Sequence, residues 1–300
     1  MPPPPTIAGV EIETVGVAGA GQMGAGISEV CATRGLRVAV VEVSAELAEA
    51  GRRRIEQSMA RAVERGKLSE AERDAALGRI TVGTDLEAFR GADMVIEAIP
   101  ENLALKREMF TRIDAIAPDR AILATNTSAL PVIEIARVTD RPEQVVGTHF
   151  FNPPPVMRLL ELVRTVATAD GVVDTARGFG ERLGKRVIVA QDRGGFIVNL
   201  LLVPFLTSAI RLYEAGFASR EDIDDGMRLG CNHPMGPLQL IDYIGLDTHL
   251  AVCDALYEEY ALPEYAAPPL LKRMVAAGWL GRKSGRGFYD YRDKPPAKAG

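Results

Sequence analysis

His149 is the residue of this sequence best suited to proton transfer. The chain has 3 histidines in 300 residues, and His149 stands in "GTHFFNPPPV", between a predicted strand and a run of prolines. Imidazole titrates near neutral pH and therefore serves as a general acid or base. Glu161 follows in a second predicted strand. If "NPPP" turns that strand back beside the first, the carboxylate orients the imidazole and favours the imidazolium form.

A glycine-rich stretch, "GAGQMGAG", follows a predicted strand and opens a helix. Gly19 suits a tight turn, Gly21 a close approach of the backbone to a pyrophosphate, and Gly24 close packing of helix on strand. The phosphates of a dinucleotide are then expected at the helix N-terminus. Gln22 and Met23, in the first turn of that helix, are expected at the same site.

Glu42 indicates which dinucleotide binds. It ends the second predicted strand, where a carboxylate accepts hydrogen bonds from the adenosine ribose hydroxyls. Its charge repels a 2′-phosphate, and no arginine follows it in "EVSAE", so NAD is favoured over NADP. Three glycines at this spacing are a weak signal alone, and the alternative is a glycine-rich turn with Glu42 as a surface charge.

Short apolar runs alternating with helical stretches predict an α/β fold, a Rossmann-type doubly wound sheet. The predicted strands cover residues 14–19, 37–43, 93–98, 121–125, 144–150, 157–163 and 186–190. A helical pair over about 44–78 is inserted in the alternation, with Ser69 and Glu72 at capping-box spacing.

Strand signals end near Gln191, and long helical stretches follow. We therefore expect an NAD-binding Rossmann-type domain over residues 11–193 and an all-α domain over residues 194–300. Residues 1–10 form a proline-rich leader that is expected to be disordered, with the pattern of neither a secretion signal nor a transit peptide.

Composition argues against several classes of partner. The 35 basic and 40 acidic residues give a net charge of −5 without long blocks of one sign, which disfavours nucleic acid and anionic membranes. The most apolar stretch, from Phe196, is shorter than the roughly 18 residues that a membrane helix needs. Cys31, Cys231 and Cys253 are widely spaced and lack a CxxC motif, so we expect no disulfide framework, no metal site and a cytoplasmic location.

Taken singly, each polar candidate has an ordinary structural explanation. A lone histidine or glutamate in an apolar run is usually a satisfied core residue. Ser128 in "NTSALP" is suited to capping the following helix, and Asn199 to a satisfied polar position in an apolar helix.

Together, the motifs of the chain resemble those of the L-3-hydroxyacyl-CoA dehydrogenases of bacteria and mitochondria, particularly the 3-hydroxybutyryl-CoA dehydrogenase branch. The similarity runs from about Glu11 to Tyr291 in matching order and spacing. It rests on "GAGQMGAGI", "VIEAIPENLALK", "ATNTSALPV", "GTHFFNPPPVMRLLELV", "GGFIVN", "HPMGPLQLIDYIGLDT" and "GRKSGRGFYDY". This resemblance implies reversible, NAD-dependent oxidation of a short-chain (S)-3-hydroxyacyl-CoA, such as 3-hydroxybutyryl-CoA, to the 3-oxoacyl-CoA. It also implies a homodimer joined through the C-terminal helices.

The resemblance assigns roles to individual residues. His149 becomes the general base and acid and Glu161 its electrostatic partner. Ser128, expected at both the cofactor and the substrate, and Asn199 hydrogen-bond the 3-oxygen of the substrate. One departure is Leu200, where many relatives carry arginine, and this puts in doubt a local salt bridge but not the role of Asn199.

Further residues match the family at the cofactor and the acyl-CoA. Glu101 and Lys106 approach the nicotinamide ribose and carboxamide, with a surface ion pair as the alternative explanation. Asn126 is expected at the cofactor, and Asn152 in the wall beside the histidine. The helical pair offers a hydroxyl and positive charge to CoA, with a solvated helix face as the alternative: Ser58, Arg61, Arg65 and Lys67.

Two other functions stay open at this point. One is a related dehydrogenase acting on 3-hydroxyadipyl-CoA, an acyl-carrier-protein thioester or a sugar acid. Arg158, Arg164 or Arg228 near the acyl end would favour a dicarboxylate. The other is a non-catalytic scaffold of the kind found in lens crystallins, against which the intact set of Ser128, His149, Glu161 and Asn199 speaks.

Overall fold

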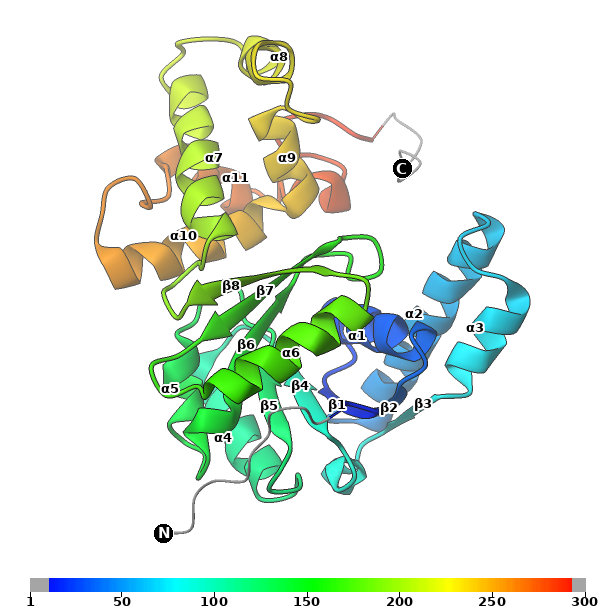
Figure 1. Ribbon diagram of the computed structural model, residues 1–300. Helices are drawn as coiled ribbons and strands as arrows, with labels where there is room; N and C mark the ends of the chain where they lie inside the picture. Colours follow the sequence, from blue (N-terminus) through cyan, green and yellow to red (C-terminus); the bar gives the residue numbers. More distant parts are fainter. Residues whose placement is uncertain (1–10, 293–300) are drawn as a thin grey trace. The chain divides into compact units, whose positions relative to one another are not determined.

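The computed structural model describes residues 11–292 and divides into two compact units with a boundary between Arg193 and Gly194 (Figure 1). The predicted disordered leader, residues 1–10, lies outside the described residues. Each unit has its own hydrophobic core, because clusters of buried apolar side chains form separately within each.

The first unit is built on an eight-stranded sheet with the order β3-β2-β1-β4-β5-β6-β7-β8. Strands β1 to β6 are parallel, β7 is antiparallel to β6, and β8 is parallel to β7. The strands are β1 (Thr14–Ala18), β2 (Arg37–Val41), β3 (Ile80–Gly83), β4 (Met94–Glu97), β5 (Ile122–Thr125), β6 (Val145–Phe150), β7 (Leu159–Arg164) and β8 (Arg186–Gln191). The chain runs outward from β1 to β3 and returns to β4 on the other side of β1, which confirms the predicted doubly wound sheet.

Helices cover both faces of this sheet (Figure 1). Helices α1 (Gln22–Thr33) and α6 (Asp170–Arg182) share one core with alternate strand residues such as Val17 and Leu160. Helices α4 (Leu103–Asp114) and α5 (Val132–Ala136) pack against each other and contact β4 and β6. Short 3-10 turns η1 (Leu86–Phe89) and η2 (Pro142–Gln144) complete the connections.

The inserted helical pair consists of α2 (Ala45–Glu64) and α3 (Glu70–Leu77), and both pack against α1. The side chain of Ser44 caps α2. Ser69 and Glu72 form the predicted capping box at the start of α3, in which each side chain bonds the backbone N–H of the other residue. These capping residues explain why the starts of the two helices could be predicted from the sequence.

Two elements of this unit have no counterpart in the sequence prediction, β3 and α6. Strand β3 is short and lies at the edge of the sheet, so it lacks a continuous apolar run. Helix α6 contains glycines, which lower helix propensity. Gly180 is nevertheless needed for packing, because a Cβ there would lie 2.7 Å from side-chain atoms of Leu160 and Val187. Close packing of α6 on the sheet thus requires a glycine, and this glycine weakens the sequence pattern from which a helix is predicted.

The second unit is helical, as predicted. It contains α7 (Val198–Glu214), α8 (Arg220–Gly230), α9 (Pro237–Ile244), α10 (Leu246–Tyr260), α11 (Pro269–Ala276) and the 3-10 turn η3 (Arg282–Ser284). Two buried aspartates join its segments: Asp224 accepts the backbone N–H of Leu238 (2.8 Å) at the start of α9, and Asp242 that of Phe288 (2.8 Å). Within residues 11–292, no helix has the length and apolarity that crossing a membrane requires.

His249 is buried in the core of the second unit, where Thr207 Oγ1 and Cys253 Sγ lie 3.4 and 3.7 Å from its Nε2. Burial lowers the pKa of His249 from 6.5 to about 4. Between these values the unfolded chain binds a proton that the folded chain does not bind. The contribution of His249 to stability is therefore present above about pH 6.5 and is lost as the pH falls toward 4.

We expect the free energy of unfolding of this unit to fall by up to about 3 kcal/mol between pH 7 and pH 4 through His249 alone. The His249→Gln variant should lose this part of the pH dependence. Trp279, the 1 tryptophan of the chain, packs against the same core and reports urea unfolding by fluorescence. A His233→Gln control should keep the wild-type dependence, and an equal slope in His249→Gln would contradict the assignment.

Candidate active site

The glycine-rich loop between β1 and α1 is shaped by close backbone contacts. Gly19 has φ 98°, and a Cβ there would lie 2.9 Å from the carbonyl oxygen of Ala98. A Cβ on Gly24 would lie 1.9 Å from the carbonyl oxygen of Gly19, so helix and strand approach too closely for any side chain. At Gly21, by contrast, a Cβ would meet nothing within 4 Å. The loop is tight toward the sheet and open at the N-terminus of α1.

Glu42 lies against this loop, directly after β2. Its Oε1 accepts the backbone N–H of Ala20 (2.6 Å), and its Oε2 accepts that of Val43 (3.1 Å). Arg54, from α2, donates to the carbonyl oxygen of Ala20 (2.7 Å). No side chain caps α1 at Gly21. The open N–H groups at the helix start, with a carboxylate beside the loop, match what the pyrophosphate and adenosine ribose of NAD require.

His149 and Glu161 face each other across the antiparallel pair formed by β6 and β7. The distance between His149 Nδ1 and Glu161 Oε2 is 2.6 Å, and the two residues are 6% and 0% exposed. The turn through "NPPP" thus places the two strands as predicted. Because the carboxylate accepts at Nδ1, the neutral ring carries its proton there, and Nε2 is the nitrogen that takes up a proton.

The surroundings of His149 fix its ring and strand. The ring packs on Phe151, with centroids 4.5 Å apart. Asn126, at the end of β5, accepts the backbone N–H of Phe150 through Oδ1 (3.0 Å). Asn152 accepts from Gln22 Nε2 (3.0 Å), so the loop after the histidine contacts the first turn of α1, where Met23 also lies.

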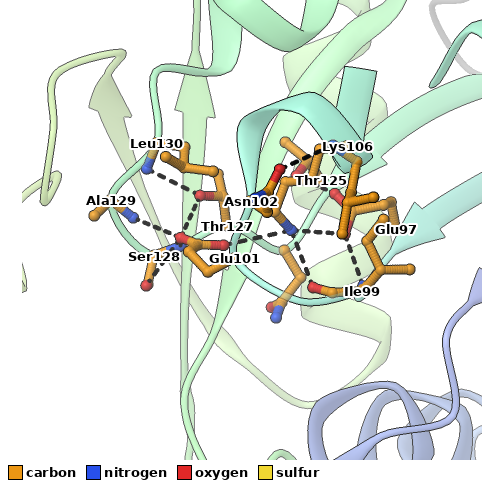
Figure 2. Close-up of polar contacts among 12 residues, drawn as sticks. Glu97, Ile99, Glu101, Asn102, Lys106, Thr125, Thr127, Ser128, Ala129 and Leu130 are labelled. Atoms are coloured by element: carbon orange, nitrogen blue, oxygen red, sulfur yellow. Dashed lines mark hydrogen bonds and ion pairs between the residues drawn. The ribbon is translucent and has the colours of Figure 1, made fainter. Parts of the chain in front are cut away.

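Ser128 belongs to the loop after β5, and Glu101 holds that loop (Figure 2). Glu101 Oε1 accepts from Thr127 Oγ1 (2.6 Å), Ser128 N (2.8 Å), Ser128 Oγ (3.2 Å) and Ala129 N (3.2 Å). Burial acts to raise the pKa of Glu101, but the charge of Lys106 and these hydrogen bonds outweigh it, and the pKa lies below its usual value. Glu101 is therefore a firmly ionised anchor for Ser128.

Lys106 lies beneath this loop and is fully buried. Its Nζ lies 2.6 Å from Glu97 Oε1, 3.3 Å from the carbonyl oxygen of Ile99 and 3.4 Å from Glu101 Oε2. The ion pair of Glu101 and Lys106 therefore has one buried partner, Lys106, and one partly exposed partner, Glu101, so it is not a pair of two solvated side chains. Glu97 is 0% exposed, and no role was predicted for it from the sequence. A charged residue at the end of an apolar strand could have indicated one.

Other predicted residues lie on, or at the end of, helices of the two units. Asn199 lies in the first turn of α7, in the second unit. Ser58 of α2 lies near Glu29, and burial raises the pKa of Glu29 against the effects of the Ser58 hydroxyl and of the Arg61 charge. Arg65 and Lys67 are exposed at the end of α2.

The three dicarboxylate candidates lie at the two ends of β7 and on α8. Arg164 pairs with Asp170 (2.8 Å). His149 lies near the carboxyl end of β6. Because β7 runs antiparallel to β6, Arg164 at the carboxyl end of β7 lies beside the opposite, amino end of β6. Arg228 pairs with Asp225 (2.7 Å) on α8, and Arg158 immediately precedes β7. Residues 11–292 contain no group of three or more His, Cys, Asp or Glu side chains arranged to hold a metal ion.

Comparison with known proteins places this chain in a family. The model of the 3-hydroxyacyl-CoA dehydrogenase NAD-binding domain matches residues 14–193, and that of the C-terminal domain of the same family matches residues 195–291. A 3-hydroxybutyryl-CoA dehydrogenase of Mycobacterium tuberculosis is 51% identical over 93% of this chain and 99% of its own. The human mitochondrial hydroxyacyl-coenzyme A dehydrogenase is 41% identical over 94% and 92%.

A solved structure agrees with this assignment. The (S)-3-hydroxybutyryl-CoA dehydrogenase PaaH1 from Ralstonia eutropha has a TM-score of 0.89 and 44% identity, covering 94% of this chain and 100% of that chain. The chain therefore belongs to the 3-hydroxyacyl-CoA dehydrogenase family and is an NAD-dependent dehydrogenase.

Proposed function

We propose that this protein oxidises short-chain (S)-3-hydroxyacyl-CoA thioesters reversibly, with 3-hydroxybutyryl-CoA as substrate, and that His149 is its general base. The observation that carries the proposal is the buried 2.6 Å contact between His149 Nδ1 and Glu161 Oε2. Relatives named 3-hydroxybutyryl-CoA dehydrogenase that are 43 to 51% identical to this chain support the substrate.

The proposed chemistry divides the work between the chain and its cofactor. NAD, when bound, accepts the hydride that leaves C3 of the substrate and becomes NADH. Nε2 of His149 takes the proton of the 3-hydroxyl group, and Glu161 stabilises the imidazolium that results. Ser128 and Asn199 donate hydrogen bonds to the 3-oxygen as it becomes a carbonyl. In the reverse direction, the imidazolium returns the proton to the oxygen.

The remaining assignments are part of the same proposal. The loop of Gly19, Gly21, Gln22, Met23 and Gly24 holds the pyrophosphate, and Glu42 the adenosine ribose. Asn126 and Glu101 lie at the nicotinamide end, and Asn152 in the wall beside the histidine. Arg65 and Lys67 offer positive charge to CoA from the exposed end of α2, with Ser58 on the same helix. We also propose a cytoplasmic homodimer joined through residues 194–300, in which exposed apolar side chains such as Phe217 and Leu229 become covered.

Assay of the wild-type enzyme with acetoacetyl-CoA tests the proposed substrate. NADH oxidation at 340 nm should be fast, and NADPH should be at least about tenfold less effective in kcat/KM, because Glu42 opposes a 2′-phosphate. Longer 3-oxoacyl-CoAs and 3-oxoadipyl-CoA serve as comparisons. A preference for the dicarboxylate, or no turnover of any thioester, would contradict the proposal.

Replacing His149 with glutamine should remove proton transfer while leaving the cofactor loop intact. We expect kcat to fall about 10²- to 10⁴-fold with the Kd for NADH, measured by fluorescence, nearly unchanged. The matched control is His233→Gln, in the second unit, which should retain wild-type turnover. A near-normal rate in His149→Gln would exclude this histidine from the mechanism.

The Glu161→Gln change should lower kcat less than His149→Gln does, because the base is still present. The acid limb of the pH–rate profile for alcohol oxidation should move to lower pH, since the imidazolium form has lost its negative partner. Glu181→Gln, on the exposed surface of α6, is a control that should keep the wild-type profile. An unchanged profile in Glu161→Gln would show that the carboxylate does not act through His149.

A further inference from the structure

Glu97, the last residue of β4, connects three segments of the first unit (Figure 2). Its Oε1 accepts from the backbone N–H of Ile99 (2.8 Å), in the turn after β4, and from Lys106 Nζ (2.6 Å), on α4. Its Oε2 accepts from Thr125 Oγ1 (2.7 Å), at the end of β5. Both carboxylate oxygens are thus held inside the protein, and this side chain has few alternative positions.

Lys106 connects Glu97 to Glu101, which holds the loop that carries Ser128. An ammonium group has three N–H donors, and the three acceptors around Nζ are Glu97, the carbonyl oxygen of Ile99 and Glu101. The Lys106 side chain is 1% exposed. A direct contact of Lys106 with the cofactor would require it to give up one of these partners. We therefore assign it an indirect role.

Glu101 is the link between this buried pair and Ser128. Its Oε2 lies 3.4 Å from Lys106 Nζ, while its Oε1 holds the hydroxyl of Thr127 and the backbone of Ser128 and Ala129. The Glu101 side chain is 38% exposed, so it depends on these contacts for its orientation. A displacement of Lys106 is therefore passed to the loop that carries Ser128.

We infer that Glu97 is a positioning residue of the reaction: through Lys106 and Glu101 it sets the place of the Ser128 hydroxyl. Stability alone does not explain the pair, because a buried ion pair is often no more stabilising than apolar side chains of similar volume. The contacts of Glu97 and Lys106 instead fix segments that border the loop of Ser128. The inference rests on the proposed function of Ser128.

The first test is a double-mutant cycle with Glu97→Gln and Ser128→Ala. Glu97→Gln should lower kcat with acetoacetyl-CoA by about 10- to 100-fold, since small displacements of catalytic groups have effects of this size. The Kd for NADH should change less than about threefold. In the Ser128→Ala background, Glu97→Gln should cost less than about twofold more, because the group on which it acts is gone.

The matched control is Asp114→Asn, which also breaks a buried ion pair of α4. Asp114 Oδ1 lies 2.6 Å from Arg141 Nε, and the two side chains are 11% and 9% exposed. It is eight residues beyond Lys106, about 12 Å along the helix. This variant should lower the melting temperature but leave kcat unchanged. If Glu97→Gln folds poorly, the neutral pair Glu97→Gln/Lys106→Met replaces it, with the same expected loss of kcat.

Hydrogen exchange gives a readout that is independent of turnover. The amides of Ser128 and Ala129 donate to Glu101, so their exchange should accelerate in Glu97→Gln and not in Asp114→Asn. Unchanged exchange, a wild-type kcat or losses that add fully to those of Ser128→Ala would each overturn the inference. An inactive wild-type enzyme would instead overturn the proposed function, while the exchange measurement still decides whether Glu97 holds the loop.

Discussion

A carboxylate removed from water must be paired, and two such groups, Glu161 and Glu97, organise the carboxyl ends of the central strands. Glu161 is paired with His149 across β6 and β7, and Glu97 with Lys106 of α4. Loss of either partner would leave a buried charge, which proteins tolerate poorly. This constraint keeps the imidazole and the Ser128 loop in fixed orientations on one rigid sheet. The reactive groups are thus positioned by elements that the fold already requires.

Direct contacts also join helix α1, which follows the glycine-rich loop, to the loop after the strand of the histidine. A Cβ on Gly26 of α1 would lie 2.7 Å from the ring of Pro154, so the helix and the loop after β6 are in close contact. Gln22 and Asn152 add a hydrogen bond between these segments. Lys185, immediately before β8, donates to the carbonyl oxygens of Pro154 and Met157 and so also holds this loop. Dinucleotide loop and base therefore belong to one packed structure.

Much of the fold could be predicted because its signals are local. The strands other than β3 are apolar runs, the capping box marks the start of α3, and the glycine motif follows β1. The pairing of His149 with Glu161 was predictable from two strands and an intervening proline turn. Helix α6 was not, because Gly180 serves a contact with β7 and β8 that the local sequence does not encode.

The site shows the same division. Glu101 and Lys106 were identified by resemblance, but the burial of Lys106 and the role of Glu97 depend on strands distant in sequence coming together. The involvement of Ser58 with Glu29 likewise follows from the packing of α2 on α1. Sequence patterns thus identified the groups that are proposed to react, whereas the buried groups that orient them emerged only from the three-dimensional arrangement.

In the proposed mechanism, the hydrogen bond from Ser128 Oγ to Glu101 has a consequence for selectivity between ground state and transition state. Without substrate, the hydroxyl hydrogen is held by an anionic oxygen, and a neutral alcohol is a weak competitor for it. As the 3-hydroxyl loses its proton, its oxygen gains negative charge and becomes an acceptor comparable to the carboxylate. In that mechanism, Ser128 donates its hydrogen bond to the substrate mainly in the transition state. The contact of Ser128 with Glu101 therefore weakens the hydrogen bond from Ser128 to the bound alcohol more than the one to the transition state. A hydrogen bond that is stronger in the transition state raises kcat, whereas one that is equally strong in both states only lowers KM.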